Sequence, residues 1–422
     1  METLNKYLSG TIMPILLIIL GIFFAFKLKF FYLIHPIKTI SKTLKNQKGG
    51  FKSLSVALAG TLGIGNIVGV SSAILLGGAG SIFWMWVSAL CAMSLKYAEV
   101  FLAMRFRRHK DGNFYGGAPY YIADGLKKKI GIKAAYALSI IFAIFCIVNS
   151  LTTGNLVQIN SVSSLLPFSR QTFGILFTLL TVIVTFGGLN SISKITSVLI
   201  PFLSLCYVLI CIFIIFLNFE EVPKVLANII TDAFSLKSTV GGFMGFGISK
   251  ALRFGVSRGV LSNEAGCGTS PMAHASSDSK DPHSQACLGI LEVFIDTILL
   301  CTLTAFVILI ASPDEAHTPM NLVLSSFEKF TGSVGVALIV FLSISFAFAT
   351  VICQFFYGAE ALNYISKSKI AKTVYNLIFY SVLIIGAIIP MELMWQISDL
   401  AISAMTVVNL VCLLLLHQHI NN

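Results

Sequence analysis

Charged residues are scarce in this chain: Asp, Glu, Lys and Arg together make up 11% of its 422 residues. Soluble proteins contain roughly 25% charged residues, so the composition excludes an ordinary soluble domain. Hydrophobic residues account for 56%, and they gather in runs close to the ~20 residues that a membrane-crossing helix needs. We therefore expect an all-α polytopic membrane protein in contact with membrane lipid.

Acidic residues are especially few, with 18 Asp and Glu against 29 Lys and Arg. The net charge of +11 does not indicate nucleic acid, because the cations lie in short loops between apolar runs. The nine Cys contain no C-x-x-C pair, and almost all lie inside apolar runs. We expect no nucleic-acid partner, no disulfide framework and no obligatory protein partner.

The apolar runs predict eleven spans. No small-residue pattern for signal-peptide cleavage follows the first span, so we expect it to be a permanent helix. The segment 111–129 contains Pro119 and several Gly, which favours a cytoplasmic loop or a helix on the membrane surface. The predicted spans cover residues 11–33, 52–77, 81–104, 132–163, 171–188, 195–217, 241–277, 285–312, 332–363, 373–390 and 394–417.

Loop cations predict the orientation of these spans. When residues 34–51 are placed in the cytoplasm, the Lys and Arg of segments 105–133 and 367–372 fall on the same side. Because cytoplasmic loops are enriched in Lys and Arg, we expect a multi-pass protein of the cell (plasma or inner) membrane, with its N-terminus outside and its C-terminus in the cytoplasm. The opposite side receives few loop cations, namely Lys6, Arg170, Lys224, Lys237 and Lys329.

The second span contains the run G-T-L-G-I-G-N-I-V-G from Gly60 to Gly69. Glycine weakens a helix, and irregular backbone at membrane depth is tolerated only where it is buried in protein or lines a cavity. Small-residue packing between helices explains some of these glycines but not Thr61 and Asn66. A dinucleotide loop is excluded because the G-x-G-x-x-G spacing is absent and no strand precedes the run. The run therefore predicts a broken helix that faces a binding site.

The seventh span contains a second break, S-N-E-A-G-C-G-T-S-P, from Ser262 to Pro271. Each break is followed by an apolar helix that carries charge, and the two groups of five spans begin on opposite faces. This is the inverted-repeat plan of secondary transporters. We predict one transmembrane domain over 1–422, with an extra helix and cytoplasmic loop in 1–50, a first repeat at 51–218 and a second at 241–417.

Several intramembrane charges leave alternatives open. Glu264 fits either a salt bridge with Arg253 or Arg258, or a site in which Asn263 and nearby backbone bind substrate or ion. Glu292 and Asp296 lie four residues apart, which fits a proton relay or the neutralisation of Lys96, Lys250 or Arg253. His274 lacks a second His or Cys at metal-ligand spacing, so we expect it to pack or cap. Further polar positions able to face a cavity are Gln158, Asn160, Ser161, Ser343, Ser345, Thr350 and Gln354.

Taken together, the motifs closely resemble the alanine or glycine:cation symporter family. The resemblance covers nearly the whole chain and rests on A-G-T-L-G-I-G-N-I-V-G-V (59–70), K-Y-A-E-V (96–100), G-N-L-V-Q-I-N-S (154–161), G-V-S-R-G-V-L-S-N-E-A-G-C-G-T-S-P-M-A-H-A (255–275) and F-I-D-T (294–297). It implies a leucine-transporter-type 5+5 inverted repeat with one additional N-terminal helix. It also implies sodium-coupled uptake of a small neutral amino acid such as alanine, glycine or their D-isomers, with Na+ as coupling ion.

The resemblance also assigns residues. The implied sodium ligands are Gly60, Asn66 and Thr350. The chain departs from the family pattern at Ile64, Ala349 and Gln354, where Thr, Ser and Trp are common, which removes a possible sodium ligand and reshapes the pocket. The implied substrate-binding residues are Thr61, Gly63, Gly65, Asn66, Gln158, Ser262, Asn263, Gly266, Gly268 and Gln354.

The sequence leaves other functions to compare with sodium-coupled symport. A proton-coupled transporter of the same fold is the nearest alternative, and it would use Glu292 and Asp296. A membrane-embedded enzyme built on Ser262, His274 or Glu264 lacks a third residue to orient nucleophile and base, so we expect no enzyme. An amino-acid sensor without transport is disfavoured, because no appended soluble domain accompanies the spans.

Overall fold

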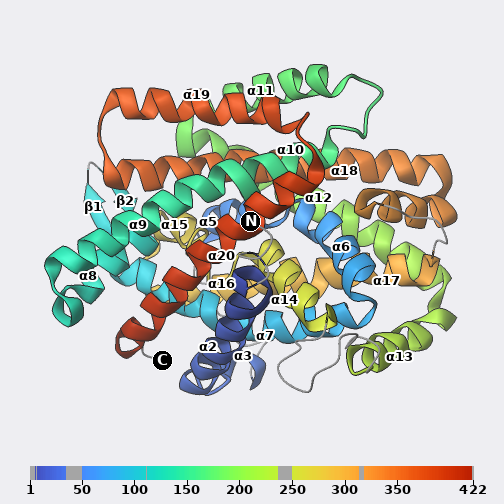
Figure 1. Cartoon of the computed structure of the whole chain (residues 1–422), viewed down its shortest axis with the longest axis horizontal. Helices are drawn as coiled ribbons and strands as arrows, with labels where there is room; N and C mark the ends of the chain where they lie inside the picture. Colours follow the sequence, from blue (N-terminus) through green and yellow to red (C-terminus); the bar gives the residue numbers. More distant parts are fainter. Residues whose placement is uncertain are drawn as a thin grey trace.

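The computed structural model describes residue 5 and residues 7–34, 50–110, 112–235, 250–312 and 318–420. These residues form a bundle of helices, with one antiparallel pair of strands, β1 (Arg108–Lys110) and β2 (Asn113–Tyr115) (Figure 1). By length and apolar composition, eight of the described helices could cross a membrane. The number is nine when the bent pair α5 (Gly50–Thr61) and α6 (Val68–Gly77) is taken as one span. The all-α polytopic class is thus confirmed.

The other helices follow the order of the chain. Before residue 235 they are α2 (Met13–Lys27), α3 (Phe31–Ile34), α7 (Gly80–Arg105), α8 (Ala118–Ile130), α9 (Ile132–Leu151), α10 (Val157–Val162), α11 (Arg170–Phe186), α12 (Gly188–Leu217) and α13 (Val222–Ala233). After residue 250 they are α14 (Lys250–Asn263), α15 (Pro271–Ala275), α16 (Pro282–Val293), α17 (Thr302–Ala311), α18 (Pro319–Ile365), α19 (Lys369–Gly386) and α20 (Met391–Leu416). Short π-helical turns join α9 to α10 and α16 to α17, at Thr152–Leu156 and Phe294–Cys301.

Each of the eleven predicted spans falls on a helix or on a broken helix. Two are not among the nine counted above, because α11 has only 17 residues and α14 and α15 are separated by the predicted break. Residues 241–249 of the seventh span and the loop residues 35–49 lie outside the described residues. The repeat boundaries 51–218 and 241–417 stay predictions.

Two helical segments are not predicted by the sequence. One is α13, a helix of 12 residues that buries a single face through Val225, Ile229 and Ala233, so a search for long apolar runs does not detect it. The other is the first part of α18, before a kink at Gly332, whose φ is +59°. The predicted ninth span therefore begins at the kink rather than at the start of the helix.

Helix packing brings the two halves together. The α7 helix packs against α14 and α16, and α14 also packs against α6, so the broken span of each half touches the other half. A second group surrounds them: α18 packs against α9, α12 and α5, and α11 runs beside α19 along one edge of the molecule (Figure 1). Both breaks consequently lie inside the bundle.

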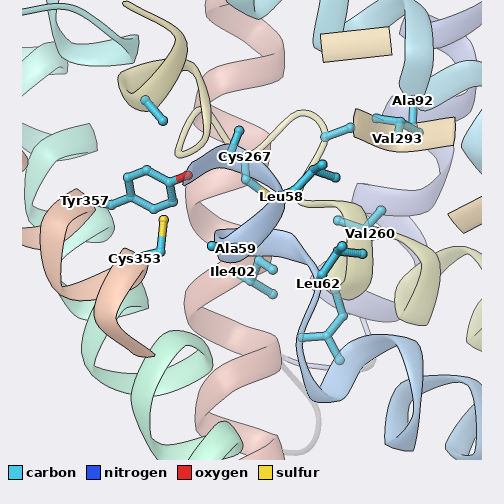
Figure 2. Packing of buried hydrophobic residues seen from close by; sticks show 14 of the residues in the cluster. Leu58, Ala59, Leu62, Ala92, Val260, Cys267, Val293, Cys353, Tyr357 and Ile402 are labelled. Carbon is cyan, nitrogen blue, oxygen red and sulfur yellow. The ribbon is translucent and has the colours of Figure 1, made fainter. Parts of the chain in front are cut away.

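The approach of α5 to α18 depends on small side chains. Figure 2 shows Tyr357 and Cys353 of α18 directed at the end of α5, next to Ala59. A β-carbon at Gly60 would lie 2.8 Å from the Tyr357 hydroxyl oxygen and 3.2 Å from the Cys353 sulfur. Gly60 therefore allows close packing at the point where the helix is about to break.

Candidate ion and substrate site

The first break lies between α5 and α6 and bends the span by 60°. Gly63 is extended, and residues Ile64–Asn66 form one 3-10 turn. The freed backbone groups are capped by side chains: the Gly63 N–H donates to Asn66 Oδ1 (3.1 Å), and the Ile64 N–H donates to Gln158 Oε1 (3.1 Å). The sequence prediction of a broken helix here is confirmed.

The second break lies between α14 and α15. Gly266 and Gly268 have φ of +84° and +78°, a region that glycine adopts without steric cost. Glu264 has φ of +49°, which is rare for a residue with a side chain and is typical of functional sites. The Asn263 side chain caps the break, because its Oδ1 accepts from the Ala265 N–H (2.9 Å).

Asp296 connects the two breaks. Asn66 Nδ2 donates to its Oδ1 (2.8 Å), and Ser262 Oγ donates to its Oδ2 (2.8 Å). The third donor is the neighbouring Thr297 hydroxyl (2.7 Å). Asp296 and Ser262 are fully buried and Asn66 is 4% exposed, and no cationic side chain of the described residues bonds to this carboxylate. The first break, the second break and a buried carboxyl group therefore meet at one point.

A second charged group stabilises the far side of the second break. Lys96 Nζ donates to the Asn263 carbonyl (2.9 Å), to Ser270 Oγ (2.7 Å) and to Glu292 Oε1 (3.2 Å), and both charged side chains are fully buried. Glu292 Oε2 also bonds to His274 Nε2 (3.0 Å). Of the alternatives left open for Glu292, the structure shows the neutralisation of Lys96. Glu292 and Asp296 do not act as one pair, because each has its own partners.

Of the two alternatives left open for Glu264, the salt bridge with Arg253 or Arg258 is wrong. Glu264 instead accepts from Thr269 Oγ1 (2.5 Å) and from Gln354 Nε2 (2.6 Å). Arg258 points to another helix, where its Nη1 lies 2.9 Å from Asp399 Oδ1 on α20 and its guanidinium lies 4.5 Å from the centre of the Trp395 ring. This pair connects α14 to α20.

All the predicted site residues lie in or beside the two breaks, but they face different neighbours. One set is directed at the first break or at the contact between the breaks: Thr350 Oγ1 donates to the Leu62 carbonyl (3.3 Å), and a β-carbon at Gly65 would lie 3.0 Å from the Ser262 α-carbon. The members of this set are Gly63, Gly65, Asn66, Gln158, Ser262, Asn263, Thr350 and Gln354. The other four face away from it. Thr61 bonds within its own helix, Gly60 faces Tyr357, and Gly266 and Gly268 face α20, α8 and α9.

Some polar positions expected to face a cavity are structural. Asn160 Nδ2 donates to the carbonyls of Gly386 and Ile389 and thereby caps the end of α19. Conversely, the sequence does not single out Asn409, whose Nδ2 donates to Glu99 Oε1 (2.6 Å) and to the Gly266 carbonyl (2.9 Å). The one available signal was an amide in the middle of the apolar last span, since buried polar groups need partners.

On the strand side, two adjacent cavities of about 210 and 200 Å³ share Asn113, Leu189, Asn190 and Ser276 in their walls. Arg107 secures the loop that follows α15 there, because its guanidinium donates to the carbonyls of Ala275, Ser277 and Ser279. The described part of the molecule is therefore hollowed beside β2.

Two broken helices that meet around a buried carboxylate, inside a bundle of apolar helices, define a secondary transporter rather than an enzyme. The model of the sodium:alanine symporter family matches residues 1–422, and the chain therefore belongs to this family.

Curated relatives agree with the family assignment. The chain is 34% identical to the sodium/alanine symporter AgcS of Methanococcus maripaludis over 439 aligned residues, which cover 98% of this chain and 94% of the relative. It is 32% identical to the probable sodium/glutamine symporter GlnT of Bacillus subtilis, with 98% and 87% covered.

Solved structures share the fold at low identity. A Na+-coupled sialic acid symporter matches with a TM-score of 0.52 and 14% identity, over 98% of this chain and 82% of that one. MhsT in complex with L-phenylalanine matches with a TM-score of 0.54 and 13% identity, over 88% of each chain. These matches confirm the leucine-transporter-type fold that the sequence resemblance implied.

Proposed function

We propose that this protein takes up a small neutral amino acid together with Na+ by alternating access. The observation that carries the proposal is the Asp296 carboxylate, which is fully buried, touches both breaks and has only neutral donors among the described residues. A buried carboxylate is costly unless a positive charge balances it, and hard cations prefer oxygen ligands. A sodium ion beside Asp296 supplies that charge.

The ion would be held by Asp296, the Ser262 hydroxyl and the Asn66 side-chain oxygen, after modest rearrangement of their present hydrogen bonds. A second candidate position lies at Thr350 Oγ1 and the Leu62 carbonyl, which are already in contact. The freed N–H groups of Gly63 and Ile64 would receive the substrate carboxylate, as helix ends at broken spans attract anions. Gln158 now accepts from the Ile64 N–H and would give way to the substrate.

Sodium and substrate would stabilise each other because they share the first break. An ion at Asn66 orders the turn that presents the substrate N–H groups, so each ligand raises the affinity for the other. Proteoliposomes test this directly: labelled alanine should accumulate under an inward Na+ gradient and not under a proton gradient alone. Accumulation driven by protons without Na+ would instead favour the proton-coupled alternative.

The Arg258–Asp399 pair should act as a gate between α14 and α20. We expect Arg258→Ala and Asp399→Asn to lower the initial rate of uptake about tenfold. Each change removes one partner of a largely buried pair that joins the two helices and leaves the other charge alone. The double exchange R258D/D399R should recover part of the rate. Trp395→Leu, which removes only the ring under Arg258, should have a smaller effect. Equal rates in all four variants would exclude a gate here.

Orientation is a separate proposal: the strand side faces the cytoplasm. The nine Cys include none that is exposed, so new surface cysteines can be labelled selectively. Ser169 and Ser368 are both exposed and lie in loops on opposite predicted sides. In intact cells we expect a membrane-impermeant maleimide to label Ser169→Cys at once and Ser368→Cys only after permeabilisation. The reverse pattern would invert the topology.

A further inference from the structure

Gln354 on α18 carries a buried acceptor without a partner. Its side chain is fully buried, and its Nε2 donates to Glu264 Oε1 (2.6 Å). Its Oε1 finds no hydrogen-bond partner among the described residues. Glu264 is already supplied with donors by Thr269 and Gln354. An unsatisfied buried amide oxygen is unfavourable, and such atoms in native structures call for a ligand or another explanation.

The position of Gln354 places this oxygen beside the first break. Gln354 follows Thr350 by one helical turn, so both lie on the same face of α18. A β-carbon at Gly63 would lie 2.4 Å from Thr350 Oγ1 and 2.9 Å from Gln158 Oε1. Four residues before Gln158, a β-carbon at Gly154 would lie 2.5 Å from the Gln354 β-carbon. The facing sides of the two spans therefore converge on the groups proposed to bind the substrate carboxylate.

An amino acid anchored at Gly63 and Ile64 would extend its side chain from this point along the α18 face toward Gln354. Resting on the proposed function, we propose that Gln354 determines specificity and that its Oε1 accepts a hydrogen bond from the substrate side chain. The substrate class is then a neutral amino acid whose side chain ends in a hydroxyl or a primary carboxamide. An apolar side chain would leave Oε1 unpaired and is disfavoured for that reason.

Competition between isosteric amino acids tests the proposal on the unaltered protein. In proteoliposomes with an inward Na+ gradient, serine should inhibit uptake of labelled alanine at about tenfold lower concentration than 2-aminobutyrate. Asparagine should likewise inhibit alanine uptake at a lower concentration than leucine. Equal or reversed potencies, with Na+-driven alanine uptake intact, would overturn the specificity proposal alone. Absence of any Na+-driven uptake would instead count against the proposed function.

Two variants separate Gln354 from its neighbour Glu264. Gln354→Met keeps the length of the side chain but removes the acceptor. It should bring the ratio of the inhibitory potencies of serine and 2-aminobutyrate close to one. Thr269→Val removes the other donor to Glu264 while leaving Gln354 Oε1 in place. It should therefore change the inhibitory potency of both compounds alike and keep their ratio. A ratio that is kept in Gln354→Met, or lost only in Thr269→Val, would overturn the assignment.

Discussion

Replacing Asp296 by Asn should lower the apparent affinity for Na+ by about 100-fold or more, with amino-acid uptake lost at ordinary Na+ concentrations. Removing the charge from one side of a buried ion pair typically costs several kcal/mol of interaction free energy. Each 1.4 kcal/mol of binding free energy is about a factor of ten in affinity. The variant keeps the size of the side chain and an oxygen acceptor for Asn66. The measurement is the initial rate of alanine uptake as a function of Na+ concentration.

The matched control makes the same carboxyl-to-amide change at the surface. Glu221 pairs with Lys224 at 2.7 Å, and both side chains are exposed, so Glu221→Gln should leave the Na+ dependence unchanged. The apparent Na+ affinity of Ser262→Ala should fall between those of Asp296→Asn and Glu221→Gln, because this change removes one neutral ligand of the ion. A Na+ dependence of Asp296→Asn equal to that of the unaltered protein would show that the ion lies elsewhere.

The second large effect concerns stability. Lys96→Met should destabilise the protein by about 3–5 kcal/mol, because it leaves the buried Glu292 carboxylate without its cation and removes two further donors from the second break. We expect the melting temperature of the detergent-purified protein to fall by several degrees. The double variant K96M/E292M should recover much of the loss, since removing both charges of a buried pair is often tolerated.

Lys224→Met provides the comparison for this change. It removes the same charge from an exposed pair with Glu221, and exposed pairs contribute little, so the melting temperature should stay as it was. If Lys96→Met has the same melting temperature as the unaltered protein, the buried network does not stabilise the second break. A double variant that is less stable than Lys96→Met would lead to the same conclusion.

The sequence predicted the two breaks because their signal is local. Glycine-rich runs with Asn66 or Asn263 inside apolar spans have few physical explanations other than unwound backbone with satisfied polar groups. The convergence of these runs with Gln158 and Thr350 came from the family resemblance. The structure places those side chains next to the first break, whereas Gly266 and Gly268 contribute backbone shape rather than facing Asp296.

The charge partners could not be predicted in the same way. Arg258 and Glu264 are not separated by three or four residues, so they do not share a helix face, and the true partner of Arg258 lies 141 residues away. The contact between Lys96 and Glu292 spans 196 residues. Which of several distant charges meet depends on helix packing, and a single sequence does not contain that information. Asp296 was recognised as charged, but its position between the breaks required the fold.

In the proposed mechanism, sodium and the amino acid occupy neighbouring positions between the two breaks and cross the membrane together. The decisive measurement is the entry of ²²Na+ into proteoliposomes, with and without unlabelled amino acid outside. The amino acid should stimulate ²²Na+ entry in the unaltered protein and not in Asp296→Asn. Amino-acid accumulation that proceeds with no stimulated ²²Na+ entry would show that the two do not cross together.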